Sequence, residues 1–323
     1  VVSGSDDAIY DPSKTRLAEY DLLPDKMGWD ETRITEEIDQ VILGMHARKD
    51  NPEMAKALEV GIPVVSFPEF VAAEAKDKKR VVIAGSHGKT TTTAMLMYVL
   101  HQLDVDFDYL VGSSVDGFEV SVKLSDAPLI LIEGDEYLSS PLDLKSKFLW
   151  YHPHISIITG IAYDHINVFP TFELYVDTFR AYIETHQPGK YFWYKNDEEL
   201  QQLSANTNVE NKAYDTPNYV MRDGKTVFLY DDKQYPLSII GEHNLQNLHA
   251  ALLVGLELGI SADAFLNAAA DFTGAGKRME KLFEDKSQVV FRDFAHSPSK
   301  LQATVNAVKK AYDHPLLAVF ELH

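Results

Sequence analysis

The most informative part of the sequence is Val81-Val82-Ile83-Ala84-Gly85-Ser86-His87-Gly88-Lys89-Thr90-Thr91-Thr92. Four apolar residues lead into a turn that contains two glycines, and a lysine and three threonines follow. Glycines allow backbone N–H groups to approach a ligand closely, and the first turn of a helix attracts phosphate. The segment therefore predicts a strand, a phosphate-binding loop and a helix that covers about residues 90–103.

Within this loop, Lys89 is expected to reach the outer phosphates of a nucleotide, and the Thr90 hydroxyl to bind Mg²⁺. The strict Walker spacing requires glycine at position 83, where this chain has isoleucine, so the loop is a shortened variant. An ordinary helix-capping turn is the alternative interpretation. The other loop residues that we expect to contact the nucleotide are Gly85, Ser86, His87, Gly88 and Thr91.

Strands and helices alternate on both sides of the loop, which is typical of a parallel sheet covered by helices. We therefore predict an α/β fold. Expected strands cover residues 41–44, 63–66, 129–132, 155–159 and 289–291, and expected helices cover residues 51–60, 172–185, 247–258, 261–272 and 298–312. Asn51 is expected to cap the first of these helices, which Gly61 should end. Residues 189–240 predict further strands, with a hairpin at 222–225, and the apolar residues 316–320 predict one more.

The composition is that of a folded protein, and it excludes several functional classes. The 323 residues carry a net charge of −19, which disfavours general nucleic-acid binding but is compatible with a local phosphate site. Because the chain has no cysteine, disulfides, thiol catalysis and cysteine zinc sites are excluded, and a reducing, cytoplasmic location is favoured. No apolar run reaches the roughly 18 residues of a membrane span, so we expect no membrane insertion.

Two polar motifs follow predicted strands in the middle of the chain. Glu133 ends the apolar run 129–132, and an acid at the end of a strand beside a phosphate loop is where a parallel sheet holds Mg²⁺. Asp164-His165 follows the strand at 155–159, and His165 is a candidate metal ligand. The alternatives are an exposed acidic turn and a structural histidine.

Two further polar motifs lie later in the chain. Asn244 and Asn247 each offer a donor and an acceptor, which the edge of an adenine ring requires, although both also fit a capped helix start. In the stretch 292–298, Asp293 is a candidate to hold a ribose hydroxyl and His296 a phosphate. An ordinary capped turn is the alternative there.

Taken in chain order, these motifs resemble the Mur ligase family of peptidoglycan synthesis. The matching stretches are Gly85–Thr91 (G-T-x-G-K-T-[TS] in the family), Glu133–Glu136 (E-A-D-E), Asp164-His165, Gly241–Asn247 (G-x-H-N-x-x-N), Gly276–Glu280 (R-R-[FLM]-E) and Asp293–Pro298 (D-Y-[AG]-H-H-P). Gly134, Gly160 and Ser297 depart from the family pattern. The resemblance spans nearly the whole chain.

The resemblance implies three domains. These are a UDP-sugar-binding Rossmann-like domain at residues 1–76 that lacks its N-terminal part, a central P-loop ATPase domain at residues 77–284, and the truncated start of a C-terminal Rossmann-like ligase domain at residues 285–323. Both ends of the sequence are therefore expected to be cut from a longer protein. The charged run 74–80 is expected to be a solvated linker between the first two domains.

The resemblance also implies an ATP-driven amide ligase that works through an acyl phosphate. Lys89, Glu133 and His165 would be catalytic, with Thr90 and Glu133 holding one Mg²⁺ and His165 helping to hold a second. The residues implied to contact ATP elsewhere are His243, Asn244 and Asn247 around the adenine, and Arg278, Asp293 and His296 from the C-terminal side.

The implied substrates are UDP-N-acetylmuramate and a short peptide or amino acid. Residues 3–6 and 51–53 resemble family members that use this nucleotide sugar. Residues 142–148 and 164–169 look most like members that attach the tripeptide L-Ala-γ-D-Glu-meso-diaminopimelate in peptidoglycan recycling, and addition of L-alanine in biosynthesis is the alternative. A nucleotide-gated switch, a folate-type ligase and a non-catalytic relative are further alternatives.

Overall fold

The computed structural model describes residues 2–45, 47–140, 142–186, 188–222, 225–276, 278–285, 287–295, 298–312 and 315–320. Contacts divide the chain into two compact units, Val1–Val71 with Leu138–Lys145 and Ala72–Tyr137 with Ser146–His323. The three-domain division at residues 76/77 and 284/285 remains a prediction. No helix in the described part of the chain is both long and apolar enough to cross a membrane.

The first unit is built around two short parallel strands and a capped helix. Strand β1 (Val41–Leu43) pairs with β2 (Val64–Ser66), and helix α2 (Pro52–Val60) connects them. The Asn51 side chain accepts a hydrogen bond of 3.0 Å from the Met54 N–H, and Gly61 ends the helix, as the sequence predicted. The unit also contains α1 (Ser13–Glu19) and the 3₁₀ turn η1 (Glu31–Arg33).

The second unit is organised by a seven-stranded sheet with the order β5-β4-β6-β3-β7-β8-β9. Only the edge strand β5 is antiparallel to its neighbour. The strands are β3 (Lys79–Ala84), β4 (Asp108–Leu110), β5 (Val122–Lys123), β6 (Leu129–Glu133), β7 (Ile155–Ile158), β8 (Lys190–Tyr194) and β9 (Glu210–Tyr214). This arrangement confirms the predicted α/β class.

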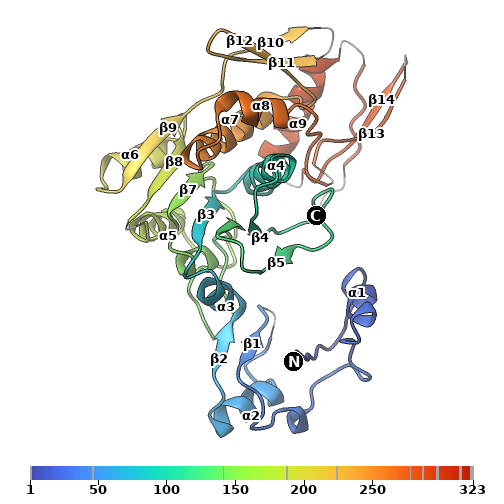
Figure 1. The fold of residues 1–323 in the computed structure, drawn as a ribbon, viewed down its shortest axis with the longest axis vertical. Helices are drawn as coiled ribbons and strands as arrows, with labels where there is room; N and C mark the ends of the chain where they lie inside the picture. Colours follow the sequence, from blue (N-terminus) through green and yellow to red (C-terminus); the bar gives the residue numbers. More distant parts are fainter. Residues whose placement is uncertain are drawn as a thin grey trace. The chain divides into compact units, whose positions relative to one another are not determined.

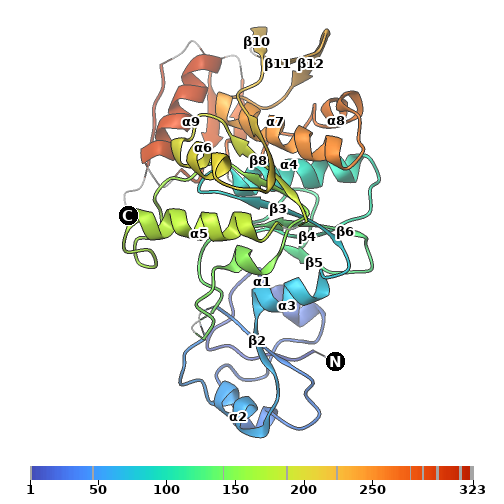
Figure 2. The same cartoon turned by 90° about the vertical axis from the view of Figure 1, so that its left-hand side faces the viewer.

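Helices cover both faces of this sheet. Figure 2 shows α4 (Lys89–Gln102), α7 (Glu242–Glu257) and α8 (Ala262–Ala268) along one face, and α5 (Phe172–Glu184) along the other. An extensive apolar core of the described residues lies between the sheet and helices α4, α7 and α8. It includes Val81, Leu96 and Leu252, all with no exposed surface. Helix α6 (Glu198–Ala205) connects β8 to β9, η2 (Lys147–Trp150) precedes β7, and α3 (Phe67–Glu74) crosses the boundary between the units.

Two small antiparallel sheets and a helix complete the second unit (Figure 1). The predicted hairpin is present, because Arg222 pairs with Lys225. The elements are β10 (Tyr219–Arg222), β11 (Lys225–Tyr230), β12 (Lys233–Leu237), β13 (Glu280–Glu284), β14 (Val289–Arg292) and α9 (Pro298–Ala311).

Several predicted boundaries are wrong. Helix α7 begins at Glu242 and not at residue 247, because Gly241 caps it and the asparagines lie inside its first turns. The charged run 74–80 is not all linker, since Lys79 and Arg80 already belong to β3, beside Leu129 and Ile130. Residues 316–320 form no strand within the described chain, which offers them no partner strand.

The order of strands brings three loops to one edge of the sheet. Strand β3 lies between β6 and β7, and all three run in the same direction. Glu133 is paired with Ile83, and Ile158 with Ala84, so the three strands end level with one another. Loops that follow parallel strands share the carboxyl edge, where α/β proteins bind ligands.

Close packing explains one departure from the family pattern. A Cβ atom at Gly134 would lie 2.7 Å from Cγ1 of the buried Val82, which leaves no space for the alanine found in E-A-D-E. We expect Gly134→Ala to lower the free energy of unfolding by about 1–3 kcal/mol. Urea unfolding of Gly134→Ala, Val82→Ala and the double variant measures the effect.

The double variant should lose less stability than the sum of the single variants, because the smaller residue at position 82 makes room for the new methyl group. Gly44→Ala, whose Cβ would meet no atom within 4 Å, is the matched control and should change little. Additive losses would contradict this steric explanation.

A buried histidine makes stability depend on pH. The Ser156 hydroxyl lies 2.6 Å from His186 Nε2, and His186 Nδ1 lies 3.0 Å from the carbonyl oxygens of Tyr182 and Ile183. Nδ1 therefore donates and Nε2 accepts, so the ring is neutral. Burial lowers the pKa of His186 from 6.5 to about 4. As the pH falls below 6.5, the unfolded chain takes up the proton first, and stability is lost until about pH 4.

We expect this group to remove about 2 to 3 kcal/mol between pH 7 and pH 4.5. The measurement is urea unfolding of the wild type and of His186→Gln over that range. Carboxylates and other histidines titrate in both proteins, so the difference between the two curves isolates His186. Parallel curves would show that His186 is not responsible.

Candidate active site

The phosphate loop lies against the loop that follows β7. A Cβ atom at Gly85 (φ 115°) would lie 2.3 Å from Thr159 Oγ1, and one at Gly88 (φ 86°) would lie 2.5 Å from Asn247 Oδ1. The Ser86 N–H donates to the Gly160 carbonyl over 2.9 Å. Both glycines are therefore required by close approach and by backbone conformation, and helix α4 starts directly behind them.

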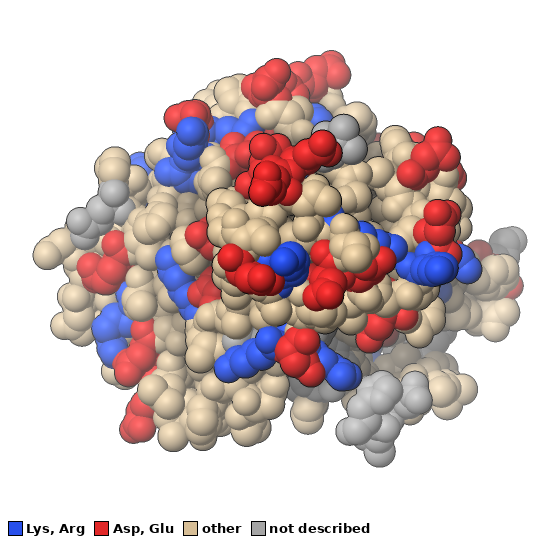
Figure 3. Space-filling model, turned by 90° about the horizontal axis from the view of Figure 1, so that it is seen from below, with Lys and Arg blue, Asp and Glu red and all other residues tan. Residues whose placement is uncertain are grey.

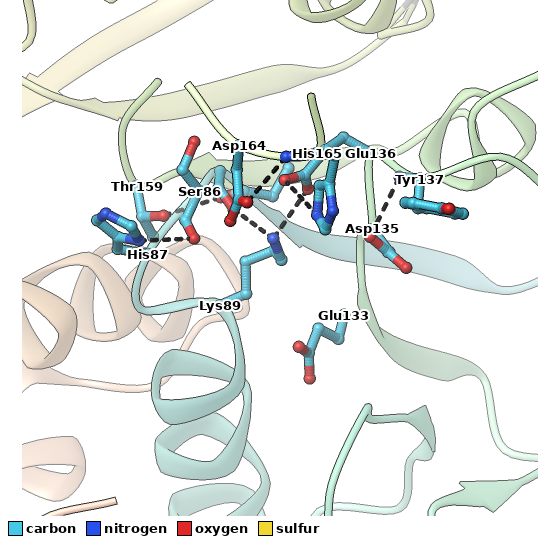
Figure 4. A network of polar contacts seen from close by, with 12 residues as sticks. Ser86, His87, Lys89, Glu133, Asp135, Glu136, Tyr137, Thr159, Asp164 and His165 are labelled. Atoms are coloured by element: carbon cyan, nitrogen blue, oxygen red, sulfur yellow. Dashed lines mark hydrogen bonds and ion pairs between the residues drawn. The ribbon is translucent and has the colours of Figure 1, made fainter. Parts of the chain in front are cut away.

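Lys89 is held by two acceptors in a nearly buried position (Figure 4). Its Nζ donates to the Gly85 carbonyl over 2.6 Å and to Glu136 Oε2 over 2.8 Å. Burial works against the charged form of Lys89, but Glu136 outweighs it, so the pKa of Lys89 is raised. An ammonium group has three donors, so this geometry keeps the charge in place and retains one donor for a phosphate oxygen.

Thr90 and Glu133 form a second cluster of oxygen atoms beside the loop. The Thr90 hydroxyl donates to Glu133 Oε1 over 2.7 Å, and the Gly112 N–H donates to Oε2 over 2.9 Å. A hydroxyl and a carboxylate fit Mg²⁺, which prefers oxygen and keeps several waters and substrate phosphates as ligands. Among the described residues, no three acidic or histidine side chains form a complete metal site by themselves.

His165 lies on the other side of Glu136, apart from the Thr90–Glu133 pair (Figure 4). Its Nε2 is 3.6 Å from Glu136 Oε1, and its ring meets Tyr137 edge-on with 5.1 Å between centroids. Its φ of 56° is unusual for a residue other than glycine, and the Asp164 carboxylate accepts its N–H over 2.8 Å. Such backbone strain is concentrated at functional sites.

Charged side chains surround this histidine. Burial acts to raise the pKa of Asp164, but the His165 N–H and nearby cations outweigh it, so that pKa is lowered. Asp135 behaves in the same way, because Lys147 lies 2.6 Å away and overcomes the effect of burial on its pKa. Both carboxylates therefore stay ionised at neutral pH.

The stretch 241–247 reaches the loop through Asn247, which contacts Gly88 as described above. Asn244 is buried, and its amide donates to the Ile240 carbonyl over 2.9 Å. Burial lowers the pKa of His243, so the ring is neutral at pH 7. Their role at the adenine remains a prediction.

The C-terminal candidates contact one another in part. Asp293 accepts the Met279 N–H over 3.1 Å, and its other oxygen accepts from Thr304. The Arg278 guanidinium lies 5.3 Å from the centre of the Phe294 ring. His296 lies outside the described residues.

Sequence analysis missed three residues that the fold brings to the loop. Glu136 is the partner of Lys89, and Tyr175 of α5 donates to it over 2.8 Å. Lys300, near the start of α9, is half-buried, and after burial it is the main cause of the lowered pKa of His87. Glu136 does have a sequence signal, because it is the last residue of the motif at 133–136, but the motif alone does not show that it faces Lys89. Tyr175 and Lys300 have none, because each comes from an element distant in the chain.

The charge of the whole molecule does not favour a polyphosphate. The chain carries a net charge of −19, and the face in Figure 3 mixes acidic and basic side chains. Attraction for a phosphate therefore has to come from the local group formed by Lys89, the backbone N–H groups of the loop and the N-terminus of α4.

Comparison with known proteins identifies the family of this chain. Residues 83–255 match the Mur ligase middle domain, which is more than half of the chain. The chain belongs to the Mur ligase family. Members of this family are ATP-dependent ligases that form amide bonds, which confirms the resemblance found in the sequence.

Two curated Mur ligases cover most of the chain. The UDP-N-acetylmuramate–L-alanyl-γ-D-glutamyl-meso-2,6-diaminoheptandioate ligase of Haemophilus influenzae is 28% identical over 95% of this chain and 70% of that protein. The UDP-N-acetylmuramate–L-alanine ligase of Clostridium kluyveri is 30% identical over 100% of this chain and 72% of that protein.

A solved structure supports the fold. The UDP-N-acetylmuramate:L-alanyl-γ-D-glutamyl-meso-diaminopimelate ligase (Mpl) of Neisseria meningitides superposes with a TM-score of 0.75 at 24% identity, over 84% of this chain and 90% of that chain. At this identity the likeness concerns the Mur ligase fold alone.

The lysine of the loop provides a direct test of the site. We expect Lys89→Ala to abolish ATP turnover, because the charge that would face the phosphates is lost. The protein should stay folded but become less stable, because the buried Glu136 carboxylate loses its cation. ADP release and circular dichroism measure the two effects. Lys212→Ala, on an exposed position of β9, is the matched control and should keep full activity. Normal turnover by Lys89→Ala would refute the phosphate-loop assignment.

Proposed function

We propose that this Mur ligase joins UDP-N-acetylmuramate to the tripeptide L-Ala-γ-D-Glu-meso-diaminopimelate at the expense of ATP, in the cytoplasm and in the service of peptidoglycan recycling. The observation that carries the proposal is that Lys89, Glu133 and His165 follow the adjacent parallel strands β3, β6 and β7 at one edge of the sheet, in the order of the family motifs. The lactyl carboxylate of the sugar would attack the γ-phosphate of ATP, which would release ADP and form an acyl phosphate. The peptide amine would then attack the acyl carbon, form the amide bond and displace phosphate.

The protein contributes position and charge to this reaction. Lys89 neutralises the transferring phosphoryl group with the donor that Gly85 and Glu136 do not use. Thr90 and Glu133 would hold Mg²⁺, with His165 beside a second ion, and the bound metal supplies charge neutralisation at the phosphates. His243, Asn244 and Asn247 would orient the adenine, and Arg278 and Asp293 would contact ATP from the C-terminal side.

Two sequence stretches support the tripeptide as the amine substrate. Residues 142–148 and 164–169 resemble the recycling members of the family. The second stretch contains His165, and the first ends near Lys147, which is paired with Asp135 at the site. The relative from Haemophilus influenzae carries that activity in its name. Addition of L-alanine is the second candidate, because the relative from Clostridium kluyveri is named for it.

The test is ADP release by the whole protein with ATP, Mg²⁺, UDP-N-acetylmuramate and either the tripeptide or L-alanine. We expect turnover with the tripeptide only, and a product whose mass is the sum of the two substrates less one water. Turnover with L-alanine only would replace the recycling function by the biosynthetic one. Turnover with neither amine would overturn the ligase proposal.

A further inference from the structure

Tyr175 is a fully buried residue in the first half of α5 that carries one polar atom into the site. Its ring packs among aromatic neighbours, with centroids 5.2 Å from Phe169 and 5.3 Å from Phe179. Its hydroxyl lies 2.8 Å from Glu136 Oε1 and 2.9 Å from Ser86 Oγ. The side chain is thus fixed by packing on one side and by two polar groups of the site on the other.

The carboxylate of Glu136 can only accept, and this fixes which atom donates in each hydrogen bond of the group. Glu136 accepts the Tyr175 proton, so the tyrosine oxygen has to accept the Ser86 hydroxyl proton. Ser86 Oγ in turn accepts the Ala162 N–H over 2.8 Å. A single relay therefore runs from the loop after β7, through the phosphate loop and Tyr175, to Glu136. Burial raises the pKa of Tyr175, so the hydroxyl keeps its proton and is a donor at neutral pH.

The relay divides the two oxygens of Glu136 between two partners. Oε1 receives Tyr175 and lies 3.6 Å from His165 Nε2, while Oε2 receives Lys89. Because Oε1 is occupied, the carboxylate cannot turn to offer both oxygens to Lys89. The ammonium group stays at the Gly85 carbonyl with its third donor available.

We propose that Tyr175 is a positioning residue for nucleotide binding: its hydroxyl fixes Glu136 and Ser86, and through them Lys89 and the phosphate loop. This inference rests on the proposed function, since the ligand that the loop would hold is the triphosphate of ATP. No recognised motif of the chain includes position 175, and the residue reaches the site only through the packing of α5.

The test is Tyr175→Phe, which removes one oxygen atom and keeps the ring. We expect the affinity for an ATP analogue with a methylene group between the β- and γ-phosphorus atoms to fall about tenfold in the presence of Mg²⁺, the usual effect of losing a hydrogen bond to a charged group. In turnover, KM for ATP should rise while KM for UDP-N-acetylmuramate stays unchanged. A purely structural role would not separate the two KM values.

Tyr182→Phe is the matched control. Tyr182 is another fully buried tyrosine of α5, and its hydroxyl takes no part in the hydrogen bonds of Glu136 and Ser86 described above. The Tyr182→Phe variant should bind the ATP analogue as tightly as the wild type does. Equal losses in both variants would assign the effect to the packing of α5 and overturn the inference.

The outcomes distinguish this inference from the proposed function. If the wild type binds the analogue and Tyr175→Phe binds it equally well, the relay has no role and the proposed function stands. If the wild type does not bind the analogue, the proposed function fails and the inference with it. A double-mutant cycle with Ser86→Ala adds a direct check, because two links of one relay should give less than additive losses and independent residues additive ones.

Discussion

The ion pair between Lys89 and Glu136 is the contact on which the rest of the site depends. Glu136 is 1% exposed, and removing a carboxylate from water is costly unless a cation and further donors compensate. Lys89 supplies the cation, and Tyr175 supplies the second donor. The pair is possible only because β6 and β3 are adjacent and parallel, which brings the loop after one strand beside the loop after the other.

Much of this arrangement follows from the sequence. Apolar runs at 81–84, 129–132 and 155–159 predict buried parallel strands, and the glycines and Lys89 between the first run and a helix predict a phosphate loop. Asn51 predicts a helix start by the same local chemistry, and its side chain accepts the expected N–H. These features can be predicted from the sequence because residues close to one another in the chain determine them.

Other features depend on residues that are distant in the chain. Glu136 occupies the last position of the motif at 133–136, yet only the register of β3 and β6 shows that it faces Lys89. Gly134 replaces the family's alanine because Val82, from the neighbouring strand, fills the space. Helix α7 starts five residues before its predicted start, since burial of Asn244 and Asn247 outweighs their preference for a capping position.

The arrangement also explains how a chain with a net charge of −19 can offer a local site for phosphate. Four carboxylates near the loop are already engaged: Glu136 with Lys89, Asp135 with Lys147, Glu133 with Thr90 and Gly112, and Asp164 with the His165 N–H. Their negative charge therefore fixes the cations and the loop in place instead of meeting the ligand directly. The positive potential that remains at the loop comes from Lys89, the N-terminus of α4 and Lys300. A bound Mg²⁺ at Thr90 and Glu133 would add to it. Electrostatic attraction of a triphosphate to this loop would thus be a property of a few fixed groups, and the overall charge of the protein would not determine it.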